Sequence, residues 1–158
     1  MSNKIKVGII ITDNQDNILL LKEKIKKNPT PLWNIVKGSY GDMGQETIFE
    51  TAIRECQEEA CVKVVLTGSL GFYTAQKKEK ISTIITFTAK IVEGAPRIAK
   101  ENEQLIRDED ISELKWFNKE EILKMKNKEF ISNRVYIIIQ NWIKKNHYPL
   151  NIIKQVEM

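Results

Sequence analysis

The segment from Glu46 to Ala60 constrains the fold most strongly, because it reads as one helix with two chemically different faces. Projected at about 100° per residue, its apolar side chains form a single stripe of the kind that packs on a protein core. The stripe consists of Ile48, Phe49, Ala52, Ile53, Cys56 and Ala60. Glu55, Glu58 and Glu59 lie on the adjoining arc, and their i, i+3, i+4 spacing makes them neighbours. We therefore expect the three carboxylates where the helix meets the body of the protein.

Carboxylates near the C-terminal end of a helix are unfavourable. Each costs about 0.3–1 kcal/mol against the helix dipole, and like charges at this spacing add a few tenths more. Arg54 can reach Glu58 at i+4, but with the cation N-terminal, which is the weaker order. A divalent cation would offset the repulsion, and oxygen ligands favour Mg²⁺ or Mn²⁺ over zinc. The alternative is a solvated acidic face, against which these electrostatics argue.

A glycine-rich loop precedes the helix, with Gly38, Gly41 and Gly44 close together in the sequence. Such a loop lets a ligand approach the backbone and exposes amide groups at a helix N-terminus, and both features suit phosphate. Glycine turns before helices also occur in proteins without a ligand there, so the loop alone leaves both interpretations open.

The rest of the chain alternates between strand and helix patterns, with polar loops at 26–31 and 93–111. Predicted strands cover residues 5–11, 18–23, 32–36, 61–76, 80–92 and 112–117. Asn118 and Glu121 resemble a capping box that opens one more helix, and an amphipathic helix follows from Ile131 to Trp142. The sequence therefore predicts an α/β sandwich with a mixed sheet, formed as a single domain over residues 1–158 with a C-terminal tail at about 146–158.

Composition narrows the class of partner. A chain of 158 residues with a net charge of +4 fits one domain, and its lysines are spread along the sequence rather than gathered in a block. The apolar runs at 7–11 and 135–139 are too short for a signal-peptide core or a membrane span. Cys56 and Cys61 are poorly spaced for a disulfide within one helix, and no secretory signal is recognised. We expect a cytoplasmic protein without a membrane partner.

The segment around the acidic helix resembles the Nudix hydrolase family, whose motif is G-x5-E-x7-R-E-U-x-E-E-x-G-U with U an aliphatic residue. In this chain Glu46 is followed after seven residues by the run Arg54-Glu55-Cys56-Gln57-Glu58-Glu59-Ala60-Cys61-Val62. The opening hairpin, the W-x-x-x-K-G run from Trp33 to Gly38 and the late strand ending in "WF" are also similar to the family. The resemblance covers residues 5–145 and implies a Nudix-type α/β/α sandwich.

Two positions depart from the motif. Tyr40 lies six residues before Glu46, where the family has glycine, so Gly38 corresponds to a family glycine only if this loop is longer. Cys61 replaces the glycine that usually ends the helix in a left-handed conformation. A cysteine in that conformation would cost about 1–2 kcal/mol, unless the helix ends differently.

The resemblance implies metal-dependent hydrolysis of a phosphoanhydride bond in a nucleoside diphosphate linked to another group. Glu55, Glu58 and Glu59 would bind Mg²⁺ or Mn²⁺ with the carbonyl of Gly38, and one of the three glutamates, or a later acid, would act as base. Gly38 would also contact the substrate. The metal would neutralise and orient the phosphates and activate water. Glu46 and Arg54 would form a pair that braces the loop against the helix.

Several later residues are further candidates. The resemblance also implies a further acidic residue from a loop late in the domain, and Glu109 is preferred among several acids. The others are Glu101, Glu103, Asp108 and Glu113. Trp116, Tyr73 or Phe87 could stack on a nucleobase, although each has an alternative role in the core.

Nucleoside triphosphate pyrophosphohydrolysis is the first of several functional hypotheses. A second is removal of pyrophosphate from the 5′ end of RNA, which a basic groove would favour, although the dispersed lysines do not indicate one. A third is a nucleotide-binding module without turnover, against which the complete acidic set argues. A fourth is an interaction protein that uses the apolar tail "LNIIKQVEM" (150–158), which is compatible with catalysis. The oligomeric state and the substrate within the class are left open by the sequence.

Overall fold

Strand β1 (Ser2–Thr12) lies in the centre of the sheet, and its alternating side chains enter two separate cores. The structure is a computed structural model that describes residues 2–158. Val7, Ile9 and Ile11 belong to one core cluster, whereas Ile10 belongs to the other. This follows from the two-residue period of a strand, which sends successive side chains to opposite faces.

The described residues form one eight-stranded mixed sheet in the order β3-β2-β1-β7-β5, with β4, β6 and β8 added beside β1, β7 and β2. β1 pairs with β7 in parallel, and the other pairs are antiparallel. The remaining strands are β2 (Ile18–Ile25), β3 (Asn28–Asn34), β4 (Val36–Ser39), β5 (Lys63–Gly68), β6 (Phe72–Lys77), β7 (Lys80–Glu93) and β8 (Ile111–Phe117).

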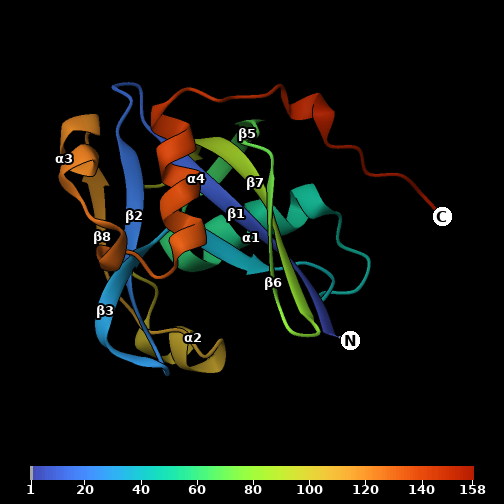
Figure 1. Ribbon diagram of the computed structural model, residues 1–158, viewed down its shortest axis with the longest axis horizontal. Helices are drawn as coiled ribbons and strands as arrows, with labels where there is room; N and C mark the ends of the chain where they lie inside the picture. The colour runs from blue at the N-terminus through green and yellow to red at the C-terminus, as the bar shows by residue number, and fades with distance from the viewer. Residues whose placement is uncertain (1) are drawn as a thin grey trace.

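Helices cover both faces of the sheet (Figure 1). The bounds are α1 (Ile48–Ala60), α2 (Glu101–Ile106), α3 (Lys119–Lys124) and α4 (Asn133–Ile143), with 3-10 turns at Asn127–Glu129 and Leu150–Ile152. The apolar stripe of α1 packs with Val7, Ile9 and Ile11, and α4 packs against the opposite face. The α/β sandwich with a mixed sheet that the sequence predicted is confirmed.

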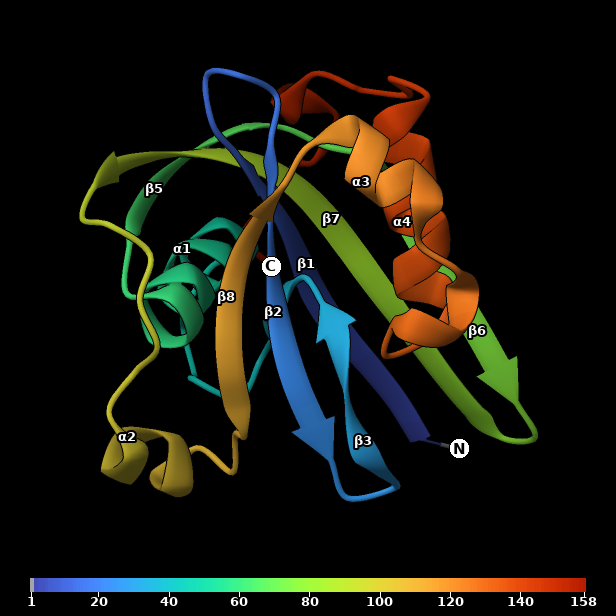
Figure 2. The same ribbon diagram turned by 90° about the vertical axis from the view of Figure 1, so that its left-hand side faces the viewer.

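The opening hairpin separates into a fork. In the described chain β1 and β2 pair at Thr12 and Ile18 only. From Ile9 back to Lys6, β1 instead pairs with β4, while β2 pairs with β3 and β8. The β2–β3 turn and α2 lie together at the open end of the fork (Figure 2). The fork leaves space beside β4.

Three sequence predictions need correction. The predicted loop at 93–111 contains α2. This helix is too short to show an apolar stripe in the sequence. The predicted strand at 61–76 is two strands, β5 and β6, separated around Gly71, which has a φ of +90°. The acidic helix begins at Ile48 rather than Glu46, because Thr47 caps it in a capping box with Glu50.

Helix α1 ends in the left-handed conformation that the family motif implies, despite the missing glycine. Cys61 has a φ of +57°, and its backbone N–H donates to the carbonyl of Gln57 at 3.1 Å. A side chain in this conformation costs about 1–2 kcal/mol relative to an unstrained one. Cys56 and Cys61 are both free thiols, as their spacing predicted.

The C-terminal tail lies against the body of the protein. Tyr148 exchanges backbone hydrogen bonds with Ser69, and Leu150 and Ile153 pack against the core cluster that contains α1. Gln155 Oε1 accepts a hydrogen bond at 3.1 Å from the N–H of Ile48, the first residue of α1. Part of the apolar tail is therefore used within the chain. Within residues 2–158, none of the helices is long and apolar enough to cross a membrane.

Candidate active site

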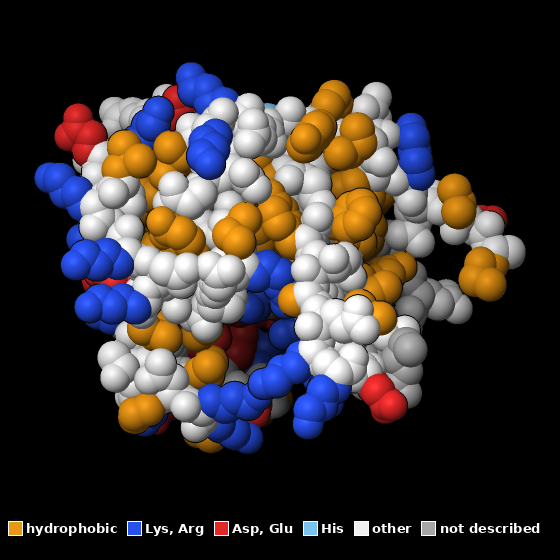
Figure 3. Space-filling model, in the orientation of Figure 1, with side chains coloured by type: hydrophobic (Ala, Val, Ile, Leu, Met, Phe, Trp, Pro, Cys, Tyr) orange, Lys and Arg blue, Asp and Glu red, His pale blue; other side chains and the backbone are white. Residues whose placement is uncertain are grey.

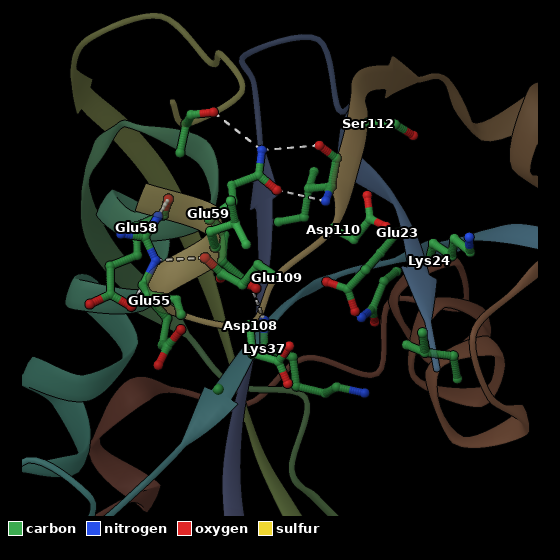
Figure 4. Close-up of a pocket in the computed structure, with 18 of the residues that line it drawn as sticks. Glu23, Lys24, Lys37, Glu55, Glu58, Glu59, Asp108, Glu109, Asp110 and Ser112 are labelled. Atoms are coloured by element: carbon green, nitrogen blue, oxygen red, sulfur yellow. Dashed lines mark hydrogen bonds and ion pairs between the residues drawn. The ribbon is translucent and has the colours of Figure 1, made fainter. Parts of the chain in front are cut away.

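A cleft of about 1760 Å³ lies between α1, α2 and the fork of β1 and β2. In the space-filling view the hollow exposes acidic side chains at its floor and basic side chains along its border (Figure 3). Carboxylates reach it from α1 and from the segment around Glu109, and Glu23 reaches it from β2 on the opposite side (Figure 4). The acidic helix and the glycine loop thus belong to one concave surface.

Glu59 joins the end of α1 to β4. Its Oε1 accepts a hydrogen bond at 2.8 Å from the backbone N–H of Lys37, and the residue is 4% exposed. Burial raises the pKa of Glu59 well above its usual value, and the hydrogen bond from Lys37 opposes that shift. The carboxyl group is therefore held in place by the strand, in surroundings that favour its neutral form when no cation is near.

Glu55 lies against the backbone of Gly38. A Cβ at position 38 would overlap the Glu55 carboxyl group, so glycine is required here for close approach rather than for an unusual φ. Burial raises the pKa of Glu55 to about 7, although the charge of Arg54 opposes the shift. The contact identifies Gly38 as the loop glycine that faces the acidic helix, whatever the length of the loop.

Arg54 holds three carboxylates. Its Nε donates to Glu46 Oε2 at 2.9 Å, while Nη1 lies 3.1 Å from Glu55 Oε1 and 3.1 Å from Glu58 Oε2. Thr51 Oγ1 also donates to Glu46 at 2.8 Å. The pair of Glu46 and Arg54 connects the loop to the helix, at the positions where the resemblance implies a brace.

Arg107, at the end of α2, connects the late acidic segment to α1. Its Nε lies 2.6 Å from Glu109 Oε1 and 3.9 Å from Glu58 Oε2, and its Nη2 donates to the backbone carbonyl of Glu58 at 3.0 Å. A cation beside the last carbonyls of a helix stabilises them against the helix dipole. Part of the repulsion that the sequence analysis assigned to a metal is therefore compensated by Arg54 and Arg107.

The donor set has the chemistry for a hard cation, but its side chains are turned toward protein partners. In the arrangement described for residues 2–158, no three His, Cys, Asp or Glu side chains lie close enough together to hold a metal ion. Glu55 and Glu58 contact Arg54, Glu109 contacts Arg107, and Glu59 contacts the Lys37 amide. The donor set consists of two buried carboxyls with raised pKa values and a third carboxylate beside them. These oxygen donors fit Mg²⁺ or Mn²⁺ once Glu55 and Glu58 exchange their contacts with Arg54 for contacts with the metal.

Not every candidate residue reaches the cleft. Trp116 packs against the core cluster that contains α1, and it is not among the described residues that line the cleft, so the geometry gives no support for a substrate contact. Phe87 is fully buried against Phe49, and the Tyr73 hydroxyl donates to the Leu70 carbonyl, so both have structural roles. Of the late acids, the cleft is lined by Glu101, Asp108 and Glu109.

Other cleft residues received no role from the sequence. Among the charged ones are Lys6, Glu23, Lys37 and Arg107. Desolvation lowers the pKa of Lys37 to about 8 and raises that of Glu23, so the cleft contains partly buried ionisable groups of both kinds. Lys37 belongs to the W-x-x-x-K-G run, which could have suggested it, whereas Lys6 and Glu23 reach the cleft only because the hairpin forks.

The NUDIX domain family model matches residues 2–137. No curated protein sequence matches the chain at a significant level. Three solved structures are similar in fold. A NUDIX hydrolase from Nitrosomonas europaea is 20% identical, with 98% of each chain covered and a TM-score of 0.78. A MutT protein from Methanosarcina mazei Go1 is 19% identical, covering 92% of this chain and 96% of that one, with a TM-score of 0.69.

The third structure is the NUDIX domain of Shewanella oneidensis NrtR in complex with ADP-ribose. It is 17% identical, covers 92% of this chain and 90% of its own, and has a TM-score of 0.65. At these identities the likeness establishes the fold. The family model covers most of the chain, including the loop and the helix that build the cleft.

Proposed function

The chain belongs to the Nudix family, and on this premise we propose that it is a nucleoside triphosphate pyrophosphohydrolase that depends on Mg²⁺ or Mn²⁺. The family and the enzyme class predicted from the sequence, a Nudix-type pyrophosphohydrolase of nucleoside diphosphate derivatives, are confirmed. The choice of nucleoside triphosphate, the metal and the role of each residue belong to the proposal.

One observation carries the proposal. Glu55, Glu58 and Glu59 line a single cleft, and Gly38 packs directly on Glu55. Glu55 and Glu59 are buried, and Glu59 lies in the last turn of α1, where negative charge is unfavourable, so the arrangement is costly for a surface without a ligand. A divalent cation, when bound, would neutralise and orient the phosphates and activate water for attack.

The residues of the chain would divide the remaining work. Glu55, Glu58 and Glu59 would hold the metal, with the Gly38 carbonyl as a further ligand. Arg54 would release Glu55 and Glu58 to the metal while it stays paired with Glu46, which keeps the loop in place. The general base would be one of the three glutamates or Glu109, whose partner Arg107 fixes it beside Glu58.

A release assay that detects pyrophosphate and nucleoside monophosphate as products tests the proposal. The chain should be incubated with Mg²⁺ or Mn²⁺ and a panel of nucleoside triphosphates, nucleotide sugars, ADP-ribose and dinucleoside polyphosphates. We expect metal-dependent release of pyrophosphate and nucleoside monophosphate from the triphosphates. Hydrolysis confined to nucleotide sugars or ADP-ribose would retain the enzyme class and refute the substrate.

A second candidate, hydrolysis at the 5′ triphosphate end of RNA, gains support from the surroundings of the cleft. The sequence showed only dispersed lysines, but in the fold several of them line the same cleft as the acidic residues. They are Lys6, Lys24, Lys26, Lys27 and Lys37. Such a border would attract a longer anion. A 5′-triphosphorylated oligonucleotide in the release assay distinguishes this candidate from the first.

Three expectations stay predictions. The cytoplasmic location rests on the sequence analysis alone. The single domain over residues 1–158 agrees with one continuous sheet but is likewise proposed. The nucleotide-type partner is supported by the ADP-ribose bound to the NrtR Nudix domain, which is a property of that protein.

A further inference from the structure

Lys6 and Lys37 lie side by side on neighbouring strands. β1 and β4 pair antiparallel, with Lys6 opposite Ser39 and Gly8 opposite Lys37, so the two lysines are diagonal neighbours on one face. Both line the cleft. Two ammonium groups are therefore placed together in a partly enclosed space, an arrangement that repulsion and desolvation both oppose.

The protein does not pair these charges. Within residues 2–158, the ammonium groups of Lys6 and Lys37 take part in no ion pair and no hydrogen bond, and Lys37 donates to Glu59 only through its backbone N–H. The charged groups of Arg54, Arg107 and Lys26 in the same cleft all form ion pairs. The carboxylates of Glu23 and Glu59 attract both ammonium groups from a greater distance. The charge of Arg134, on α4, repels both.

The lysines and the α1 carboxylates lie on opposite sides of β4. Val36 packs in the core with α1, and Gly38 faces Glu55, so Lys37 between them points to the other face of the strand. Val7 also packs in the core with α1. Because successive side chains of a strand alternate, its neighbour Lys6 points to the other face of the sheet, toward α4. The cleft thus extends around the edge of β4, with carboxyl groups on one side and unpaired ammonium groups on the other.

We propose that Lys6 and Lys37 form a subsite for the terminal phosphates of a triphosphate group, across β4 from the carboxylates of α1. A phosphate chain that starts beside Glu55 and Glu59 would pass the edge of β4 and end between the two ammonium groups. This inference rests on the proposed function, because it takes the reacting phosphates to lie at the α1 carboxylates.

The subsite has a consequence for substrate class. A nucleoside diphosphate linked to a sugar presents a neutral group where a triphosphate presents another phosphate. Unpaired ammonium groups favour the substrate that carries more negative charge, because only that substrate supplies a phosphate with which they can pair. The subsite therefore selects a free triphosphate end over a nucleotide sugar or ADP-ribose. A nucleotide and an RNA 5′ end share that chemistry.

Binding of non-hydrolysable analogues tests the subsite without relying on turnover. The dissociation constants of α,β-methylene ATP and α,β-methylene ADP should be measured with Mg²⁺ by calorimetry for the full chain and for Lys6→Met, Lys37→Met and Lys63→Met. Lys63 is exposed on β5 away from the cleft and serves as the matched control. A 5′-triphosphorylated RNA oligonucleotide is the third probe.

We expect the unaltered chain and Lys63→Met to bind the ATP analogue more tightly than the ADP analogue. Each cleft variant should weaken binding of the ATP analogue by about 10- to 100-fold and leave that of the ADP analogue nearly unchanged. Lysine-dependent binding of the RNA but not of the ATP analogue would support the subsite and identify RNA ends as the source of the triphosphate.

Two results would overturn the inference. One is an unaltered chain that binds both analogues equally and shows no lysine-dependent binding of the RNA, and the other is a preference for the ATP analogue that persists in Lys6→Met and Lys37→Met. Failure of the proposed function is distinguishable, because it would appear as absent metal-dependent hydrolysis in the release assay. Lysine-dependent binding of the third phosphate would support the subsite even then.

Discussion

The carboxyl group of Glu55 rests on the bare backbone of Gly38, at a separation that no side chain at position 38 would permit. The contact joins the end of β4 to the middle of α1. Because Glu59 also accepts a hydrogen bond from Lys37, two of the three carboxylates proposed as metal ligands are positioned by the same short strand. The geometry of the cleft therefore depends on β4 as much as on the helix.

Gly38→Ala should damage catalysis by displacing Glu55. The added methyl group overlaps the carboxyl group, so either the side chain or β4 must move. We expect hydrolysis to fall by about 100-fold, as for a comparable misplacement of a reacting group, and stability to fall by about 1–3 kcal/mol. Steady-state kinetics and urea denaturation measure the two effects.

Gly44→Ala is the control for that substitution. Gly44 has a φ of +71° and open space around it, so alanine there strains the backbone without displacing a carboxyl group. It should lose stability but retain hydrolysis. Equal activity in Gly38→Ala and in the unaltered chain would show that the contact with Glu55 does not matter for function.

Metal-free protein should lose stability as the pH rises from 5 to 7. Burial raises the pKa of Glu55 to about 7 from 4.5 and also raises that of Glu59 well above its ordinary value. In this window the folded chain binds more protons than the unfolded chain, so the free energy of unfolding falls as the pH rises. The slope is at most about 1.4 kcal/mol per pH unit for each group. Lys37, with a pKa lowered to about 8, titrates above this window.

Millimolar Mg²⁺ should reverse most of that loss at pH 7, because it binds the folded carboxylates and not the unfolded chain. Urea denaturation between pH 5 and 7, with EDTA or with Mg²⁺, measures both effects. A stability that rises with pH in EDTA, or that ignores Mg²⁺, would contradict this account of the buried carboxyls.

Glu58→Gln should abolish hydrolysis and preserve the fold. The glutamine keeps the size of the side chain and removes the charge that the metal needs. Arg54 keeps its partner Glu46, so the change in stability should stay within about 1 kcal/mol. Glu79→Gln, in the exposed turn between β6 and β7, is the matched control and should retain full activity. An active Glu58→Gln enzyme would remove Glu58 from the metal site.

Cys61→Gly should stabilise the protein. Cys61 ends α1 with a φ of +57°, which glycine adopts without steric cost, although glycine also loses more conformational freedom on folding. Together the two effects should raise the free energy of unfolding by about 0.5–1 kcal/mol. A higher urea midpoint with unchanged activity would measure this gain. A lower midpoint would show that the thiol contributes packing that exceeds the strain.

The sequence predicted those helices and strands whose signal lies within a few consecutive residues. The apolar stripe of α1, the capping box of Asn118 and Glu121, and the strand pattern at 80–92 each lie within one short segment, and each corresponds to an element of the fold. The family motif similarly placed Glu46 beside Arg54 from spacing alone. These features depend on residues a few positions apart, so the sequence carries them directly.

Features that depend on distant pairing were not predictable in this way. Lys6 and Lys37 meet because β4 pairs with β1 in place of β2, and no local pattern announces that exchange. The sequence predicts a loop where α2 forms, because this helix is short and exposes Leu105 and Ile106. Arg107 enters the cleft from the end of that helix, so its contacts with Glu58 and Glu109 were missed for the same reason.

The central claim is that the carboxylates of α1 hold a divalent cation against the phosphates of the substrate. Crystals grown with Mn²⁺ and α,β-methylene ATP test it most directly, because anomalous scattering locates the manganese without ambiguity. We predict an ion coordinated by Glu55, Glu58 and Glu59, with the Arg54 contacts of Glu55 and Glu58 exchanged for metal and the phosphates directed toward Lys6 and Lys37. Manganese bound elsewhere, with Arg54 still paired to Glu55 and Glu58 beside the bound nucleotide, would contradict it.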